Sequence, residues 1–317
     1  MRQYAIKRIA LFFPTVLLIT IIVFVVMRLL PGDICLAILS DGEGNFTQEE
    51  LQECRVELDL DKNLTLQYFD WIGGVFQGDF GDSLWFKAPV MRELGDRIPV
   101  TVQLAVMSML LAIVVAVPLG IVSAIKPDSW IDYAARTFTL LGISIPNFLA
   151  AILMVLFLIR VFDWLPPLGY EKLWENPGLN LQQMIFPALA LGFYEMAFIA
   201  RVTRSSMLEI IREDYMRTAR SKGLSETVVL LRHGLKNAFL PVLTTSGWIF
   251  ARLFGGTVII ETIFLVPGMG RILIESIFQR DYTMIQAEIV IIGVFIVAIN
   301  LVVDLLYGWL DPRIRYA

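Results

Sequence analysis

Residues that could perform catalysis are few in this chain of 317 residues. It has one histidine, His233, and two cysteines, Cys35 and Cys54, none of them at a spacing typical of a metal site or of a nucleophile with its base. A G-x-x-x-x-G-K-[ST] segment is absent, so the sequence contains no P-loop to bind the phosphates of ATP. We therefore expect a protein that is not itself an enzyme and that binds no metal or cofactor.

Two charged residues stand out because each lies inside an apolar segment. Glu195 falls in the apolar stretch 181–200, and Arg252 falls in the stretch 238–260. A charge at the centre of a membrane helix costs about 3 kcal/mol, so such residues usually face a partner charge or a wet cavity. Two interpretations stay open: the residues line the path of a solute, or they form a structural ion pair.

The composition tells which elements must position these residues. With 57% hydrophobic residues and a mean hydropathy of +0.69, the chain is far more apolar than a soluble protein. At about 1.5 Å per residue, six segments can each cross a bilayer core of about 30 Å. These segments are 9–30, 100–125, 137–159, 181–200, 238–260 and 284–306. We predict an all-α polytopic membrane protein with six transmembrane helices.

The distribution of charge predicts the orientation. Residues 31–99 hold 14 acidic and five basic residues, which indicates an extracytoplasmic domain between the first and second helices. The termini and the segments 126–136 and 201–236 together hold 15 Lys or Arg, against nine in the segments expected outside. Both termini should therefore be cytoplasmic. No basic patch for nucleic acid is present.

Both cysteines fall in the predicted extracytoplasmic domain, where thiols can oxidise. A disulfide between Cys35 and Cys54 would close a loop of about twenty residues and contribute about 3 kcal/mol in the chain-entropy model. Two free thiols are the alternative, because the sequence does not give their separation. In the same domain, Thr47 and Glu50 have the spacing of a capping box that opens a helix.

The basic segment 201–237 has the pattern of two helices separated by a glycine. Up to Lys222, apolar residues at helical spacing share one face, namely Met207, Ile211, Tyr215 and Ala219. Gly223 is the expected helix stop, in the left-handed conformation. Ser225 is the predicted N-cap of a second, shorter helix.

This segment also carries a resemblance. The run 214–225, DYMRTARSKGLS, followed by His233, Asn237 and Pro241, resembles the EAA loop of bacterial ABC importer permeases of the peptide and nickel branch. The resemblance extends over nearly the whole chain through the segments 78–83, 267–271 and 311–315. Arg217 and Thr218 stand where the general motif has Glu and Ala, so the match is to the form found in this branch.

The resemblance implies a type I ABC importer permease fold and a role for the cytoplasmic loop. In that family the short helix after the glycine sits in a groove of a separate ATPase. The residues expected to couple to the ATPase are Ala219, Gly223, Leu224, Ser225 and Glu226. His233, Asn237 and Pro241 would support the loop.

The same resemblance implies the partners and the cargo. They are a homologous second permease, two ATPase subunits that bind ATP and Mg, an extracytoplasmic solute-binding protein, and membrane lipid. Peptides are the expected cargo, while near relatives carry nickel complexes, glutathione or oligosaccharides. The location implied is the bacterial inner membrane.

These inferences give four regions. Residues 1–30 would form the cytoplasmic N-terminus and first helix, 31–99 the extracytoplasmic domain, 100–308 the five-helix permease core and 309–317 a cytoplasmic tail. Two other classes of protein stay open from the residues alone. One is an ion-coupled secondary transporter that uses carboxylates such as Glu195 and Glu288 as relays, and the other is a membrane scaffold.

Overall fold

The computed structural model describes residues 2–29, 35, 47–57, 61–167 and 169–310. This part of the chain is almost entirely helical, and its single β-bridge joins Asp82 and Pro89. Five elements are long and apolar enough to cross a membrane. They are α1 (Arg2–Leu29), α5 (Val90–Ile125), α8 (Pro177–Ile211), α11 (Lys236–Ile263) with the short segments before it, and α13 (Tyr282–Leu310).

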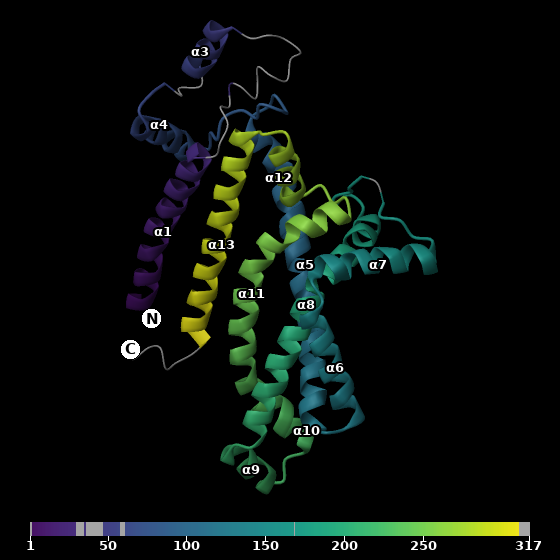
Figure 1. The fold of residues 1–317 in the computed structure, drawn as a ribbon. Coiled ribbons are helices and arrows are strands. Elements are labelled where there is room, and N and C mark those ends of the chain that lie inside the picture. The colour runs from purple at the N-terminus through teal and green to yellow at the C-terminus, as the bar shows by residue number, and fades with distance from the viewer. Residues whose placement is uncertain (1, 30–34, 36–46, 58–60, 168, 311–317) are drawn as a thin grey trace.

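A further pair of helices, α6 (Trp130–Ser144) and α7 (Asn147–Phe162), reaches spanning length only when the two are taken together, and the pair is bent by 109° at the break between them. The continuous helix predicted over 137–159 is therefore wrong. Pro146 explains the break, because a proline disfavours helical geometry in the residue before it and has no amide to donate. Ile145 is accordingly extended, with φ −89° and ψ 121°. In Figure 1, α7 extends sideways away from the other helices.

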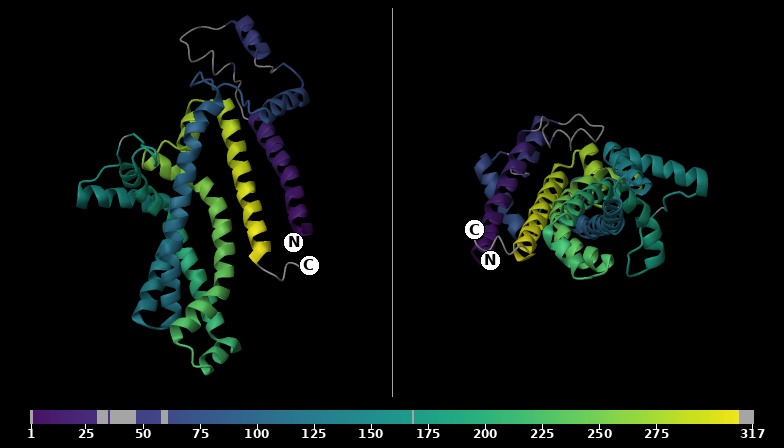
Figure 2. Two further views of the ribbon diagram at one scale, coloured as in Figure 1. Left: turned by 180° about the vertical axis from the view of Figure 1, so that it is seen from behind. Right: turned by 90° about the horizontal axis from the view of Figure 1, so that it is seen from below.

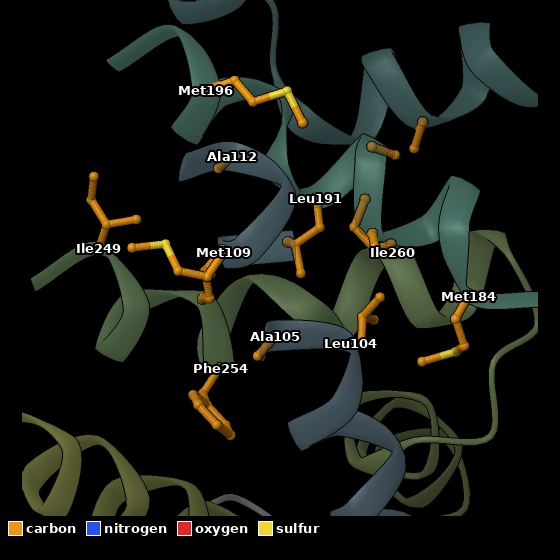
Figure 3. Close-up of a cluster of buried hydrophobic side chains, with 14 of the residues drawn as sticks. Leu104, Ala105, Met109, Ala112, Met184, Leu191, Met196, Ile249, Phe254 and Ile260 are labelled. Carbon is orange, nitrogen blue, oxygen red and sulfur yellow. The ribbon is translucent and has the colours of Figure 1, made fainter. Parts of the chain in front are cut away.

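The core lies where α5, α8 and α11 pack together. Their facing side chains form one buried cluster that includes Leu104, Leu191, Ile249 and Phe254 (Figure 3). Gly192 lets α8 approach α5 closely, since a Cβ there would lie 2.9 Å from the carbonyl oxygen of Ser108. Figure 2 shows α1 and α13 packed beside each other on one side of this core.

Several short elements cover one end of the bundle (Figure 1). They are α3 (Gln48–Glu57), α4 (Leu64–Phe76) and α12 (Met269–Phe278). The predicted capping box is present, because Thr47 Oγ1 accepts from Glu50 N at 3.2 Å and Glu50 Oε2 accepts from Thr47 N at 2.7 Å. Arg28 of α1 donates to Gln67 of α4 at 2.9 Å, which ties this covering layer to the first helix.

Some sequence-based expectations fall partly outside the described residues. Cys35 is buried and disulfide-bonded, but the Cys54 side chain lies outside them, so the proposed pairing stays a prediction. The same holds for most of the tail 309–317 and for the boundary at residues 30 and 31. The N-terminal end of α1 and the C-terminal end of α13 both point away from α3 and α4 (Figure 1).

Candidate functional site

A short helix, α9 (Asp214–Ser221), lies at the end of the molecule opposite α3 and α4 (Figure 1). The single helix expected from 201 to 222 is wrong, because α8 ends at Ile211 and Glu213 is extended with φ −68° and ψ 148°. Within α9, Arg217 lies one turn beyond Asp214, with Nη1 3.5 Å from Oδ1, while the extended backbone of Glu213 interrupts the helix before it. As a result, α9 is a separate element with its own orientation.

Buried apolar side chains hold α9 in place. Met216 and Ala219 pack against Val229, which lies beyond the turn, and against Ile210 of α8. Gly234 leaves room for this contact, because a Cβ there would come within 3.3 Å of the Met216 Cε atom. The base of α9 is thus fixed on the bundle, while its remaining faces are exposed.

The turn after α9 is set by Gly223 and by an ion pair across it. Gly223 has φ 78°, the left-handed conformation expected for a helix-stop glycine. Arg220 and Glu226 face each other as a bidentate pair, Nη2 to Oε1 at 2.9 Å and Nε to Oε2 at 3.1 Å. The hydrogen bond to Glu226 raises the pKa of the Arg220 guanidinium.

The sequence suggested an independent short helix after Gly223, but the structure does not show one. Instead α10 (Glu226–Val228) passes through a wide π-helical segment, Val229–Leu235, directly into α11. Ser225 occupies the predicted N-cap position with an extended backbone but makes no side-chain capping bond. The short helix that stands alone is α9, before the glycine. A continuous helical rod runs from Glu226 to Ile263.

The residues predicted to support the loop differ in their contacts with α9. The Asn237 Nδ2 atom donates to the Tyr215 hydroxyl at 2.9 Å and to the His233 carbonyl at 3.2 Å, so it joins α11 to α9. Pro241 lies in α11 one turn further along, on an exposed face. Leu224 is 41% exposed in the turn. The predicted coupling residues therefore divide into a buried anchor, Ala219, and an exposed rim that includes Leu224.

The structure brings Glu195 and Arg252 together between α8 and α11. Arg252 Nη2 lies 3.6 Å from Glu195 Oε1, and the side chains are 48% and 3% exposed respectively. The guanidinium also lies over two aromatic rings, 5.3 Å from the centroid of Tyr194 and 5.0 Å from that of Trp248. A buried carboxylate thus lies behind a half-exposed cation.

The sequence did not reveal a second charged cluster, which joins α6 to α8. The buried carboxylate of Asp132 accepts from Arg204 Nε at 2.7 Å and from its Nη2 at 2.8 Å, and it also accepts from the Ser123 hydroxyl. Arg136 lies 2.8 Å from the same carboxylate. The i,i+4 spacing of Asp132 and Arg136 was the one sign of this cluster in the sequence, because Arg204 lies 72 residues after Asp132.

Another residue missed by the sequence analysis is Glu261, at the end of α11. Its buried carboxylate accepts from the Thr101 hydroxyl at 2.7 Å and from the Arg271 amide at 3.2 Å. The Thr101 hydroxyl in turn accepts from the Met269 amide at 2.8 Å. These bonds fix the first turn of α12 against α5 and α11.

Two protein-family descriptions match the chain. The family of the N-terminal region of binding-protein-dependent transport system membrane components matches residues 1–105. The family described as the inner membrane component of such systems matches residues 116–316. The chain belongs to the family of inner-membrane components of binding-protein-dependent transport systems.

Relatives from this transport family align with the chain over its full length. A putative peptide transport system permease protein of Brucella abortus is 41% identical over 316 residues, covering 100% of each chain. A dipeptide transport system permease protein of Alkalihalophilus pseudofirmus is 37% identical and a glutathione transport system permease protein of Salmonella choleraesuis 39% identical, again over 100% of both chains.

Two solved structures support the fold. A methionine ABC transporter in inward-facing conformations matches with a TM-score of 0.56 and 17% identity, covering 70% of this chain and 97% of that one. An amino acid ABC transporter solved with histidines gives a TM-score of 0.55 and 15% identity over 69% and 94% of the two chains. The predicted all-α polytopic importer-permease fold is confirmed. The chain is a transport permease component rather than an enzyme, and it acts with ATPase and binding-protein partners.

Proposed function

We propose that this permease imports short peptides and that α9, with the Gly223 turn, is the surface on which a partner ATPase acts. The observation that carries this proposal is mechanical. The exposed turn leads without interruption into a rod that ends at Ile263, and Arg252 lies along that rod. A displacement of the turn is therefore transmitted to residues inside the bundle.

The contacts around α9 suit a part that transmits force. Met216 and Ala219 anchor it in a small apolar cluster, and the bond between Asn237 and Tyr215 joins it to α11. The ion pair between Arg220 and Glu226 adds a contact across the turn between α9 and α10. A surface fixed in this way moves with the bundle instead of deforming on its own.

The proposed assembly contains this chain, a homologous second permease, two ATPase subunits and an extracytoplasmic solute-binding protein. ATP and Mg would be bound by the ATPases. The end of the bundle bearing α9 and both chain ends would face the cytoplasm, and α3, α4 and α12 would face the binding protein. The excess of Lys and Arg in the segments at the α9 end supports this orientation.

Cargo is proposed from the relatives. Two of the relatives described above are named for peptides or dipeptides and one for glutathione, which is itself a small peptide. The path would pass between the two permeases along the face of α8 and α11 that holds Glu195 and Arg252.

The test is uptake by the reconstituted assembly in liposomes. We expect labelled peptide to enter only with hydrolysable ATP and loaded binding protein, and to continue entering when an ionophore collapses ion gradients. Uptake that persists without ATP and stops with the ionophore would instead indicate an ion-coupled transporter. No uptake of any peptide, together with uptake of another solute, would remove peptides as the cargo.

A further inference from the structure

The face of α11 that contains Arg252 is exposed along about three turns of the helix. Trp248, Arg252, Gly255 and Ile259 recur at helical spacing, and all four are exposed. A Cβ on Gly255 would meet no atom within 4 Å, so the space in front of the helix is free at that level. The aromatic rings of Tyr194 and Trp248 border the guanidinium.

The depth of Arg252 in α11 excludes an ordinary lipid-facing position. It lies about 24 Å from the start of the helix and about 16 Å from its end at about 1.5 Å per residue. A half-exposed arginine at that depth would be strongly unfavourable in hydrocarbon. The face must therefore border water or another protein.

The contact with Glu195 leaves the Arg252 guanidinium able to bind a second anionic group. The separation of 3.6 Å between the two charged groups is longer than a hydrogen bond, and the carboxylate is 3% exposed whereas the guanidinium is 48% exposed. A guanidinium has five N–H donors in a planar fork that matches a carboxylate in a bidentate arrangement. The rings of Tyr194 and Trp248 stabilise the guanidinium as a cation, and its 48% exposure leaves part of it accessible to such a ligand.

From this geometry, and resting on the proposed function, we infer that Arg252 binds the terminal carboxylate of the peptide as it passes through the permease. Every linear peptide with a free C-terminus carries this group whatever its side chains, so one arginine can serve cargo of many sequences. The buried charge of Glu195 weakens the attraction. Weak binding is what a transport path requires, since the cargo must also leave.

The experiment uses the complete assembly in liposomes, with trialanine and trialanine amide as the probes. Both are presented at concentrations that saturate the binding protein, and peptide taken up per ATP hydrolysed is measured. The wild type should prefer trialanine by about ten-fold, the size expected for a bond to a charged group. Arg252→Gln should take up both peptides at the same low ratio, and Arg252→Lys should restore part of the preference.

Two further variants separate carboxylate binding from a structural ion pair. Glu195→Gln keeps the guanidinium, so the preference for trialanine should persist, whereas a purely structural pair would make it behave like Arg252→Gln. Arg160→Gln, which removes an exposed arginine from α7, is the matched control and should leave the preference unchanged.

Four results would overturn the inference. They are equal uptake of the two peptides by the wild type, loss of the preference in Glu195→Gln, an unchanged preference in Arg252→Gln, or loss of the second permease from purified Arg252→Gln assemblies. The last would place Arg252 at an interface between permeases. Failure of the wild type to transport any peptide would contradict the proposed function itself, and is thereby distinguished from failure of this inference.

Discussion

Replacing Gly223 tests whether the angle of the cytoplasmic turn matters. The residue has φ 78°, and a Cβ added to it would meet no atom within 4 Å. Crowding by neighbours is therefore not expected, and the cost of a substitution lies in the backbone alone. For an ordinary side chain, left-handed geometry costs about 1 to 2 kcal/mol, while asparagine tolerates it better.

The expected results form a graded series. Gly223→Asn should retain most activity, Gly223→Ala should lose part, and Gly223→Val should lose most, since valine is branched at Cβ. A penalty of about 2 kcal/mol exceeds what the exposed ion pair across the turn contributes, about 0 to 1 kcal/mol. The turn should therefore shift away from its native angle and strain the contact of Met216 with Val229. The membrane bundle should remain folded in all three variants.

The assay measures three properties of each reconstituted variant. They are ATP hydrolysis stimulated by loaded binding protein, peptide uptake, and retention of the ATPases on purification. We expect stimulation and uptake to fall together in the order Asn, Ala, Val, with an unchanged melting temperature. Equal activity of the Asn and Val variants would refute the reasoning, because the backbone conformation of the turn would then be irrelevant.

Three other predictions concern stability. Asp132→Asn should lower the free energy of unfolding by about 3 kcal/mol, because it leaves Arg204 without its buried counter-charge. Thermal unfolding checks this against Lys172→Gln, which removes the exposed ion pair of Lys172 with Glu175 and should cost about 0 to 1 kcal/mol. Gly120→Val should lower the free energy of unfolding by roughly 1 to 3 kcal/mol, since a Cβ there would lie 2.6 Å from Thr203 Cβ. Gly95 has open space around it, so Gly95→Ala should change the free energy of unfolding by about 1 kcal/mol or less. An equal loss of stability in both variants would contradict the packing account. Reduction should lower the melting temperature by an amount equivalent to about 3 kcal/mol if Cys35 and Cys54 are paired, and mass spectrometry that finds both thiols free without reductant would contradict the pairing.

The membrane helices and the Gly223 turn could be predicted because their signals are local. A long apolar run indicates a membrane-spanning helix directly, and a glycine after a helical pattern indicates that the helix ends there in the left-handed conformation. Pro146 was equally visible, but it lies inside a long apolar run, so hydropathy concealed the break between α6 and α7. The break between α8 and α9 was hidden for a related reason, since Ile211 and Tyr215 keep helical spacing in the sequence although the backbone of Glu213 between them is extended.

Other features depend on contacts between distant parts of the chain. Polar residues such as Arg232 and His233 interrupt the hydropathy, which suggested a separate short helix, yet the backbone continues through a π-helical segment into α11. Asp132 and Arg204 meet only because α6 and α8 pack together. Glu195 and Arg252 were identified individually by their cost in a membrane, and the fold supplied the distance between them.

The most direct measurement of the central claim is cross-linking from the Gly223 turn. A cysteine placed at Leu224, which is 41% exposed, would carry a short photo-reactive cross-linker in the complete assembly. The control is Lys172→Cys, an exposed position just before the start of α8, whose other end leads to α9. The account predicts that Leu224→Cys cross-links to an ATPase subunit, that the yield changes when ATP is bound, and that Lys172→Cys does not reach the ATPase. Cross-linking to the ATPase from Lys172→Cys, or none from Leu224→Cys in an assembly that still transports, would contradict it.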